Sequence, residues 1–157
     1  MNELSVVHYT GKERLDELMK NAGWNERQIE GQLRAIHRLA KEDDGQVLVA
    51  KAGNELFGYI SVEFHKWNTL GQIQGLIVHP DQRRKGIGAQ LVNEVEDFIR
   101  NKGARGIYVD TPVDNDGGRK FYVAIGYKED CIRSEYYDTG VDAVVYLKTV
   151  SYTHLRA

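Results

Sequence analysis

The 157-residue chain has one cysteine, two prolines and no long apolar run. A single cysteine, Cys131, excludes a disulfide within the chain, so we expect a cytoplasmic protein in a reducing compartment. Without a second cysteine nearby, Cys131 is expected to be a buried apolar residue rather than a nucleophile. No apolar segment reaches the roughly 18 residues of a membrane-spanning helix, and no signal peptide is visible. We therefore expect no membrane partner.

The chain also lacks an excess of positive charge. It has 21 Lys and Arg against 23 Asp and Glu, a net charge of -2. Because nucleic-acid-binding domains usually carry a basic surplus, we expect no nucleic-acid partner. A chain of this length buries roughly 70% of its surface on folding, so we expect neither a metal nor a second domain. We place one domain at residues 1–150 and interpret the aperiodic residues 151–157 as a tail.

Hydrophobic periodicity predicts regular elements throughout residues 1–150. Strands are predicted at 4–10, 46–52, 56–65, 71–79, 106–111, 129–138 and 142–149. Helices are predicted at 12–22, 25–42, 87–101 and 115–127, with Thr10 and Asn25 as N-caps. The strand, helix and strand between 72 and 111 form a crossover, so these two strands are expected to be parallel. The predicted class is α/β, with a mixed, mainly antiparallel sheet of about seven strands flanked by about four helices.

One segment, "IVHPDQRRKGIGAQL", combines cations, glycines and the start of a helix. Its three cations are Arg83, Arg84 and Lys85, and its two glycines are Gly86 and Gly88. Glycines allow close backbone approach, and the first amides of a helix point outward at the positive end of its dipole. The segment therefore predicts a phosphate site, with a solvated basic turn as the alternative. It fits neither the P-loop pattern nor G-x-G-x-x-G, although a generic nucleotide-binding domain stays open.

This segment resembles the acetyl-CoA loop of the GCN5-related N-acetyltransferase (GNAT) family. The family motif Arg/Gln-x-x-Gly-x-Gly/Ala is matched by Arg83, Gly86 and Gly88. A second family motif is matched by Asn115, Phe121-Tyr122 and Gly126-Tyr127, in the expected order and spacing. The resemblance implies acetyl transfer from acetyl-CoA to a primary amine of a small molecule, peptide or protein, by direct attack. It also implies a V-shaped split for the coenzyme between the strands at 72–78 and 106–111.

The resemblance further implies which residues contact the coenzyme. The pyrophosphate is expected at the loop and the helix start, which comprise Arg83, Arg84, Lys85, Gly86, Gly88 and Ala89. The backbone of Ile77 and Val78 is expected to pair with the pantetheine arm as an added strand would. Asn115 corresponds to a residue that hydrogen-bonds this arm, and Tyr122 to one near the thioester sulfur.

The chemistry of acetyl transfer assigns roles to two of these residues. Negative charge develops on the thioester oxygen, and the backbone N–H of Val78 is expected to stabilise it. The departing thiolate needs a proton, which Tyr122 is expected to donate; the alternative is a core tyrosine packed with Phe121.

A general base is the part that the sequence identifies least directly. A lysine-like amine with a pKa near 10.4 is less than about 0.1% neutral at pH 7, so a base or a water chain is needed. Several family members carry Glu on the strand before the loop, where this chain has Gln72 and Gln74. Glu63 and His65, on the neighbouring strand, are the expected substitutes, with solvated side chains as the alternative.

The absent strand glutamate keeps a second function open. The alternative is a non-catalytic acyl-CoA-binding sensor or interaction domain. The expected partner of an enzyme is the amine acceptor, whose identity the sequence leaves open. Dimers are common in the family that this sequence resembles, so a homodimer is one expected assembly.

Overall fold

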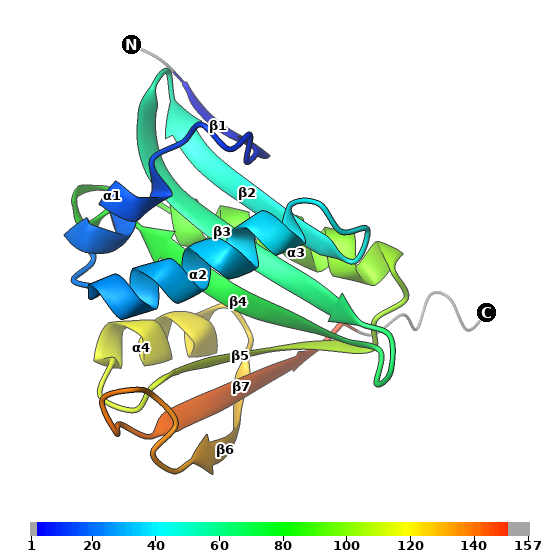
Figure 1. The fold of residues 1–157 in the computed structure, drawn as a ribbon. Helices are drawn as coiled ribbons and strands as arrows, with labels where there is room; N and C mark the ends of the chain where they lie inside the picture. Colours follow the sequence, from blue (N-terminus) through cyan, green and yellow to red (C-terminus); the bar gives the residue numbers. More distant parts are fainter. Residues whose placement is uncertain (1–2, 151–157) are drawn as a thin grey trace.

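The computed structural model describes residues 3–150 and shows seven strands in one sheet with four α-helices (Figure 1). The strands are β1 (Leu4–His8), β2 (Gly45–Ala52), β3 (Glu55–His65), β4 (Leu70–Val78), β5 (Gly106–Pro112), β6 (Lys128–Arg133) and β7 (Ala143–Thr149). The helices are α1 (Leu15–Asn21), α2 (Glu26–Leu39), α3 (Ile87–Asn101), α4 (Asp116–Ala124) and the short 3-10 helix η1 (Pro80–Gln82). Among these described helices, none is both long and apolar enough to span a membrane. The predicted α/β class is confirmed, and the predicted tail, residues 151–157, lies outside the described residues.

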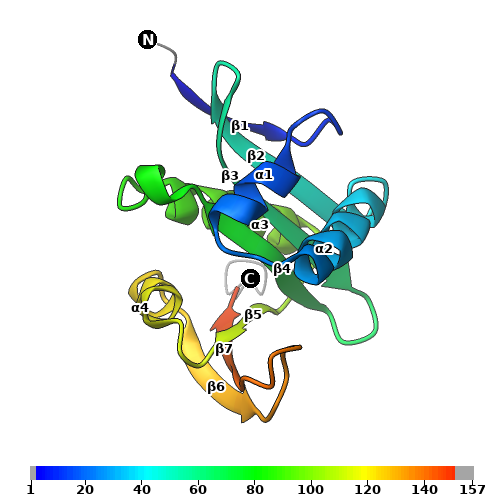
Figure 2. The same ribbon diagram turned by 60° about the vertical axis from the view of Figure 1, so that its left-hand side comes forward.

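The sheet has the strand order β1-β2-β3-β4-β5-β7-β6, and its neighbours are antiparallel except for β4 and β5. The parallel pair has only three registered residue pairs, from Leu70 with Gly106 to Gln72 with Tyr108. Beyond Gln72 the two strands diverge, and Figure 2 shows the two parts of the sheet spreading apart. The predicted parallel crossover and the predicted split are both confirmed.

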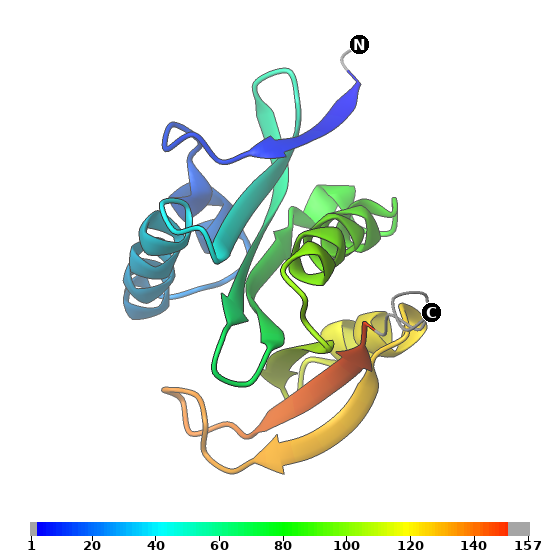
Figure 3. The ribbon, with the colours of Figure 1, turned by 90° about the vertical axis from the view of Figure 1, so that its right-hand side faces the viewer.

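Helices cover both faces of the sheet because its central strands are apolar on both sides. In β2, Val47 and Val49 pack with α1 and α2, whereas Leu48 and Ala50 pack with α3. Figure 3 shows α2 and α3 on opposite sides of the sheet. Fully burying one such aliphatic side chain contributes about 1.5–3 kcal/mol. These two cores pack β2, β3 and β4 between helices on both faces, and β4 forms one wall of the split.

Two of the predicted element boundaries are wrong. Thr10 does not cap α1, because its hydroxyl donates to the Glu13 carboxylate at 2.9 Å, and the helix begins only at Leu15. The strand predicted over 129–138 ends at Arg133. The chain then turns back at Glu135, whose φ is 49° and whose N–H donates to Asp142 Oδ1 at 2.8 Å. The residues after Arg133 therefore form a loop between β6 and β7.

The predicted cap of α2 and the predicted bounds of α3 are confirmed. Asn25 caps α2 in a capping box with Gln28, in which each side chain accepts from the other residue's backbone N–H. The predicted helix at 87–101 matches α3. The prediction that Cys131 is buried is wrong. This residue lies on β6, which forms the edge of the sheet and has all its residues exposed.

Candidate active site

The split between β4 and β5 opens into a groove of about 1350 Å³. Its walls are the second half of β4, the start of α3, the end of β5, the start of α4, part of α2 and the β6–β7 loop. In open α/β sheets, ligands commonly bind beyond the carboxyl ends of strands where the strand order changes. Among the described residues, no group of three or more His, Cys, Asp and Glu is placed to hold a metal ion.

The edge of β4 presents backbone polar groups to this groove. His79 N donates to Phe57 O at 2.7 Å, and Val78 is registered with Gly58 of β3. Because hydrogen-bonded and non-hydrogen-bonded pairs alternate in an antiparallel ladder, the Val78 N–H and C=O point away from β3. Arg83 Nε reaches this outward carbonyl at 3.3 Å. The N–H of Val78, and the side of its carbonyl that Arg83 does not occupy, thus face outward where an extended ligand could pair.

Ile77 is placed differently from Val78. It is registered with Tyr59, so the same alternation directs its backbone groups toward β3. Its side chain is buried in the core formed with α1 and α2. Ile77 lines the groove, but its backbone belongs to the β3–β4 ladder rather than to a ligand.

The chain enters α3 through two left-handed residues, Arg84 with φ 65° and Gly86 with φ 82°. The first backbone bond of the helix runs from Gln90 N to Gly86 O at 3.0 Å. The preceding amides have no carbonyl one turn back, so they point out of the helix start. Gly88 and Ala89 line the groove there. Outward amides at the positive end of a 15-residue helix form an anion site.

The two glycines of the motif are needed for different structural reasons. A Cβ on Gly86 would meet no atom within 4 Å, but its left-handed conformation is one that side chains rarely adopt. A Cβ on Gly88 would lie 3.1 Å from Phe121 Cζ. Gly86 therefore leaves open space in front of the amides, and Gly88 allows α4 to pack against α3.

The three cations do not act alike. Arg83 and Arg84 line the groove. Lys85 is not among the lining residues, and its ammonium donates to Gln82 Oε1 at 3.0 Å. Since Arg83 is held by Val78 O, its side chain also links the loop to the end of β4.

Asn115 lines the groove but uses its side chain within the fold. Its Oδ1 accepts from Gly118 N at 3.0 Å, which caps α4, and its Nδ2 donates to Thr111 Oγ1 at 3.1 Å. These two bonds fix the start of α4 beside the end of β5. The predicted contact of Asn115 with the coenzyme arm stays a prediction.

Tyr122 lies on α4 at the inner wall of the groove, with 6% of its surface exposed. Its ring packs against Phe121 at 5.2 Å, Tyr127 at 5.7 Å and Tyr146 at 5.8 Å between centroids. Burial raises the pKa of the Tyr122 phenol, and the negative charge of Asp110 raises this pKa further. The phenol therefore keeps its proton at neutral pH and can donate it.

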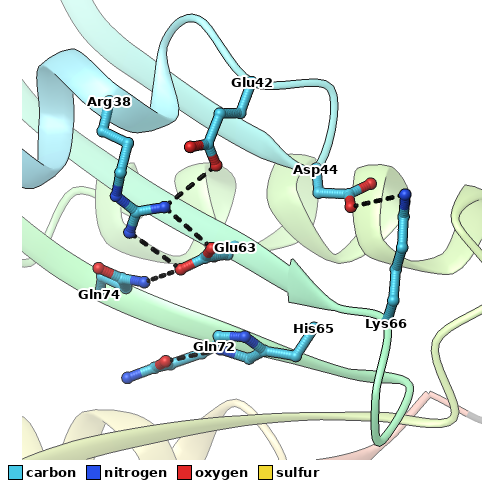
Figure 4. A network of polar contacts seen from close by, with 8 residues as sticks. All are labelled: Arg38, Glu42, Asp44, Glu63, His65, Lys66, Gln72 and Gln74. Carbon is cyan, nitrogen blue, oxygen red and sulfur yellow. Dashed lines mark hydrogen bonds and ion pairs between the residues drawn. The ribbon is translucent and has the colours of Figure 1, made fainter.

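Glu63 and His65, the predicted bases, do not line the groove. Figure 4 shows the side chains to which each is bonded. Glu63 accepts two hydrogen bonds from Arg38 and one from Gln74, and the Arg38 bonds lower the pKa of this carboxyl. His65 Nε2 is bonded to Gln72 Oε1 at 2.9 Å. A carboxylate held by three donors with a lowered pKa accepts a proton less readily than an ordinary one. The geometry therefore favours neither residue as the base, and that role stays a prediction.

Asp110 is a groove residue that the sequence analysis missed. It lies near the end of β5, and its Oδ1 accepts from the hydroxyl of Tyr137, on the β6–β7 loop, at 2.5 Å. Burial raises the pKa of Tyr137, and this hydrogen bond adds to the increase. The position of Asp110 at the carboxyl end of a predicted parallel strand was the available signal. Tyr137 lies 27 residues further along the chain, and no signal in the sequence predicted its contact with Asp110.

Comparison with known proteins identifies similarities of sequence and of fold. The chain is 33% identical over 86 residues to N-alpha-acetyltransferase 30 of Schizosaccharomyces pombe, covering 54% of this chain and 57% of that protein. It is 33% identical over 89 residues to the aminoalkylphosphonate N-acetyltransferase of Salmonella typhimurium, covering 54% and 58%. The match thus spans less than two thirds of either relative's length.

The fold is shared with the PaiA N-acetyltransferase of Thermoplasma acidophilum, whose structure was solved in complex with coenzyme A. The TM-score is 0.73 at 22% identity, with 94% of this chain and 99% of that chain covered. The family model described as "Acetyltransferase (GNAT) family" matches residues 12–127. These residues include β4, the glycine loop, the start of α3 and Tyr122, which together form most of the groove. The chain therefore belongs to the acetyltransferase (GNAT) family.

Proposed function

We propose that this protein transfers an acetyl group from acetyl-CoA to a primary amine by direct attack of the amine. The observation that carries the proposal is the adjacency of two backbone sites in one groove: the free edge of β4 and the outward amides at the start of α3. An extended amide chain that ends in phosphates matches this pair of sites. Membership of the family supports the same donor.

The residues of the groove fit the coenzyme. Acetyl-CoA supplies an acetyl group activated as a thioester. Arg84 and the amides at Gly86, Gly88 and Ala89 would hold its pyrophosphate, and the open space in front of Gly86 leaves room for it. The outward C=O of Val78 would accept a hydrogen bond from its amide-bearing arm, which leaves the Val78 N–H for the thioester.

Two groups of the chain would act on the thioester end. The N–H of Val78 donates to the carbonyl oxygen as negative charge develops there, the role of an oxyanion-hole donor. The new N–C bond forms, the C–S bond then breaks, and Tyr122 gives its phenolic proton to the sulfur, while the proton that the new amide nitrogen loses returns the phenolate to a phenol through water. Tyr122 is protonated at neutral pH, and its raised pKa makes it a weaker acid than an ordinary tyrosine, so the role rests on its place in the groove.

Asp110 would serve the acceptor amine. Tyr137 occupies Oδ1 of this carboxylate, and we assign Oδ2 to the ammonium group of the acceptor. The carboxylate attracts the ammonium and then takes its proton, directly or through one water, so that the neutral amine can attack. The negative charge of Asp110 raises the pKa of Tyr122, which indicates that the two groups are close. This supports the proposal that the base and the acid lie at one end of the groove.

Incubation with acetyl-CoA and a panel of amines tests this function, with acetylated products detected by mass spectrometry. The named activities of the relatives suggest the panel: peptides with a free α-amine, and aminoalkylphosphonates. Polyamines extend it. We expect one class to be acetylated well above the uncatalysed rate. Tight coenzyme binding with no product from any amine would instead support an acyl-CoA sensor.

A further inference from the structure

β4 contains one more residue than β3 just beyond its three pairs with β5. Val62 is registered with Ile73 and Ser61 with Gly75, which leaves Gln74 as an extra residue in β4. A bulge of this kind bends its strand and increases the local twist. The bend at Gln74 therefore helps to direct the second half of β4 away from β5, where the groove opens.

Gln74 is held from two directions. Its side-chain Nε2 donates to Glu63 Oε1 on β3 at 2.6 Å, and its backbone carbonyl accepts from Gln32 Nε2 on α2 at 3.2 Å. The next residue packs closely against β3, because a Cβ on Gly75 would collide with the Tyr59 hydroxyl. Side-chain bonds and packing thus fix the bulge in addition to the strand ladder.

Arg38 of α2 orients the carboxylate that holds Gln74 (Figure 4). Its Nη1 and Nη2 donate to Oε2 and Oε1 of Glu63 at 3.0 and 3.1 Å. Nη1 also donates to Glu42 at 3.0 Å. A bidentate guanidinium–carboxylate pair is directional as well as strong. The chain Arg38–Glu63–Gln74 therefore connects α2 through β3 to the bulge of β4.

We propose that Arg38, Glu63 and Gln74 are positioning residues that hold the β4 backbone at the angle needed to bind the coenzyme arm. The role in coenzyme binding rests on the function proposed above, whereas the effect on β4 does not. Glu63 then acts by orienting Gln74, and it does not transfer protons. Weakening the chain should loosen residues 74–78 and should reduce coenzyme affinity more than the chemical step.

Arg38→Met tests this role, because it removes the guanidinium and keeps much of the apolar stem. We expect faster amide hydrogen exchange at residues 74–78 of the free protein. We also expect the KM for acetyl-CoA to rise about tenfold, with kcat changed by less than about threefold. Arg38→Lys should show a smaller rise in exchange and in KM than Arg38→Met, because lysine keeps the charge but not the bidentate geometry.

Arg14→Met is the matched control. Arg14 also makes two bonds to one carboxylate, Asp16, both at 3.0 Å, and this pair lies at the start of α1. The control should leave the exchange of residues 74–78 and the KM unchanged. Gln74→Ala is the second variant, and combining it with Arg38→Met should add little, because both interrupt one chain of contacts.

Three results would overturn the proposal. One is unchanged exchange and unchanged KM in both Arg38→Met and Gln74→Ala. Another is a Glu63→Gln variant whose kcat falls about 10²-fold at constant KM, as expected of a base. The third is an equal loss in the Arg14→Met control. If the wild-type protein binds no coenzyme, the proposed function fails, and the exchange measurement alone then decides whether the chain positions β4.

Discussion

In the proposed function the groove has a coenzyme side and an acceptor side, which are built in different ways. The coenzyme side consists of backbone groups from one continuous segment, from Val78 to Ala89. The acceptor side consists of side chains from separate elements, such as Asp110 on β5 and Tyr137 on the β6–β7 loop. The backbone site depends on glycines and chain geometry, whereas the side-chain site depends on tertiary packing. The two sides can therefore be altered separately by mutation.

The largest effect is expected on the coenzyme side from Gly86→Glu. The new carboxylate would enter the space in front of the α3 amides and repel phosphate, and the backbone at φ 82° would be strained. Losing two charge-assisted bonds corresponds to about a 10³-fold weaker affinity for CoA, measurable by calorimetry. Gly103→Glu is the control, because Gly103 has a similar φ of 88° and open surroundings at the other end of α3. Equal losses in both variants would mean that strain, rather than the phosphate site, is responsible.

On the acceptor side, Asp110→Asn should preserve coenzyme affinity and lower kcat/KM for the amine by about 10²–10³-fold. Asparagine keeps the size of the side chain and an oxygen for Tyr137, but it neither attracts an ammonium group nor takes its proton. Stopped-time assays over a range of amine concentrations measure the change. Wild-type turnover in this variant would remove Asp110 from the acceptor side.

Tyr122→Phe should lower kcat by about 10²-fold with little change in CoA affinity. Phenylalanine keeps the ring packing against Tyr127 and Tyr146, so the fold should remain intact. A circular dichroism melt and a CoA titration serve as controls for the kinetic measurement. If turnover is unchanged, Tyr122 has only a packing role.

The smallest effect is expected from Tyr137→Phe, which removes the hydrogen bond that orients Asp110. We expect the KM for the amine to rise about tenfold, the scale of one hydrogen bond to a charged group. Tyr136→Phe is the adjacent control, because Tyr136 is half-exposed and does not line the groove. A loss in Tyr136→Phe equal to that in Tyr137→Phe would point to the loop as a whole.

The contrast between the two sides also explains what could be predicted from the sequence. The α3 helix, the parallel pair and the glycine loop follow from local periodicity and from residues close together in the chain. The Ile77 backbone was assigned to the ligand from the resemblance to the family, and its register with Tyr59, which directs it toward β3, could not be predicted from the sequence. The β6–β7 loop was predicted as part of a strand, since its apolar residues gave no sign of the turn at Glu135.

The acceptor side was harder to predict for a physical reason. Glu63 was chosen as a base because it lies on a strand next to the loop, but Arg38 and Gln74 bind it away from the groove. Asp110 was overlooked because its partner Tyr137 lies on a distant loop. Sites made of side chains from several elements depend on register and loop paths, which local patterns do not specify.

Amine-dependent release of free thiol from acetyl-CoA is the most direct test of the proposed transfer. Wild-type protein should release thiol only when a suitable amine is present, in equal amounts with the acetylated amine. Asp110→Asn should bind acetyl-CoA as tightly as the wild type and should release thiol at least about 10²-fold more slowly. Tight acetyl-CoA binding by the wild type, with no thiol release for any amine in the panel, would contradict the proposal.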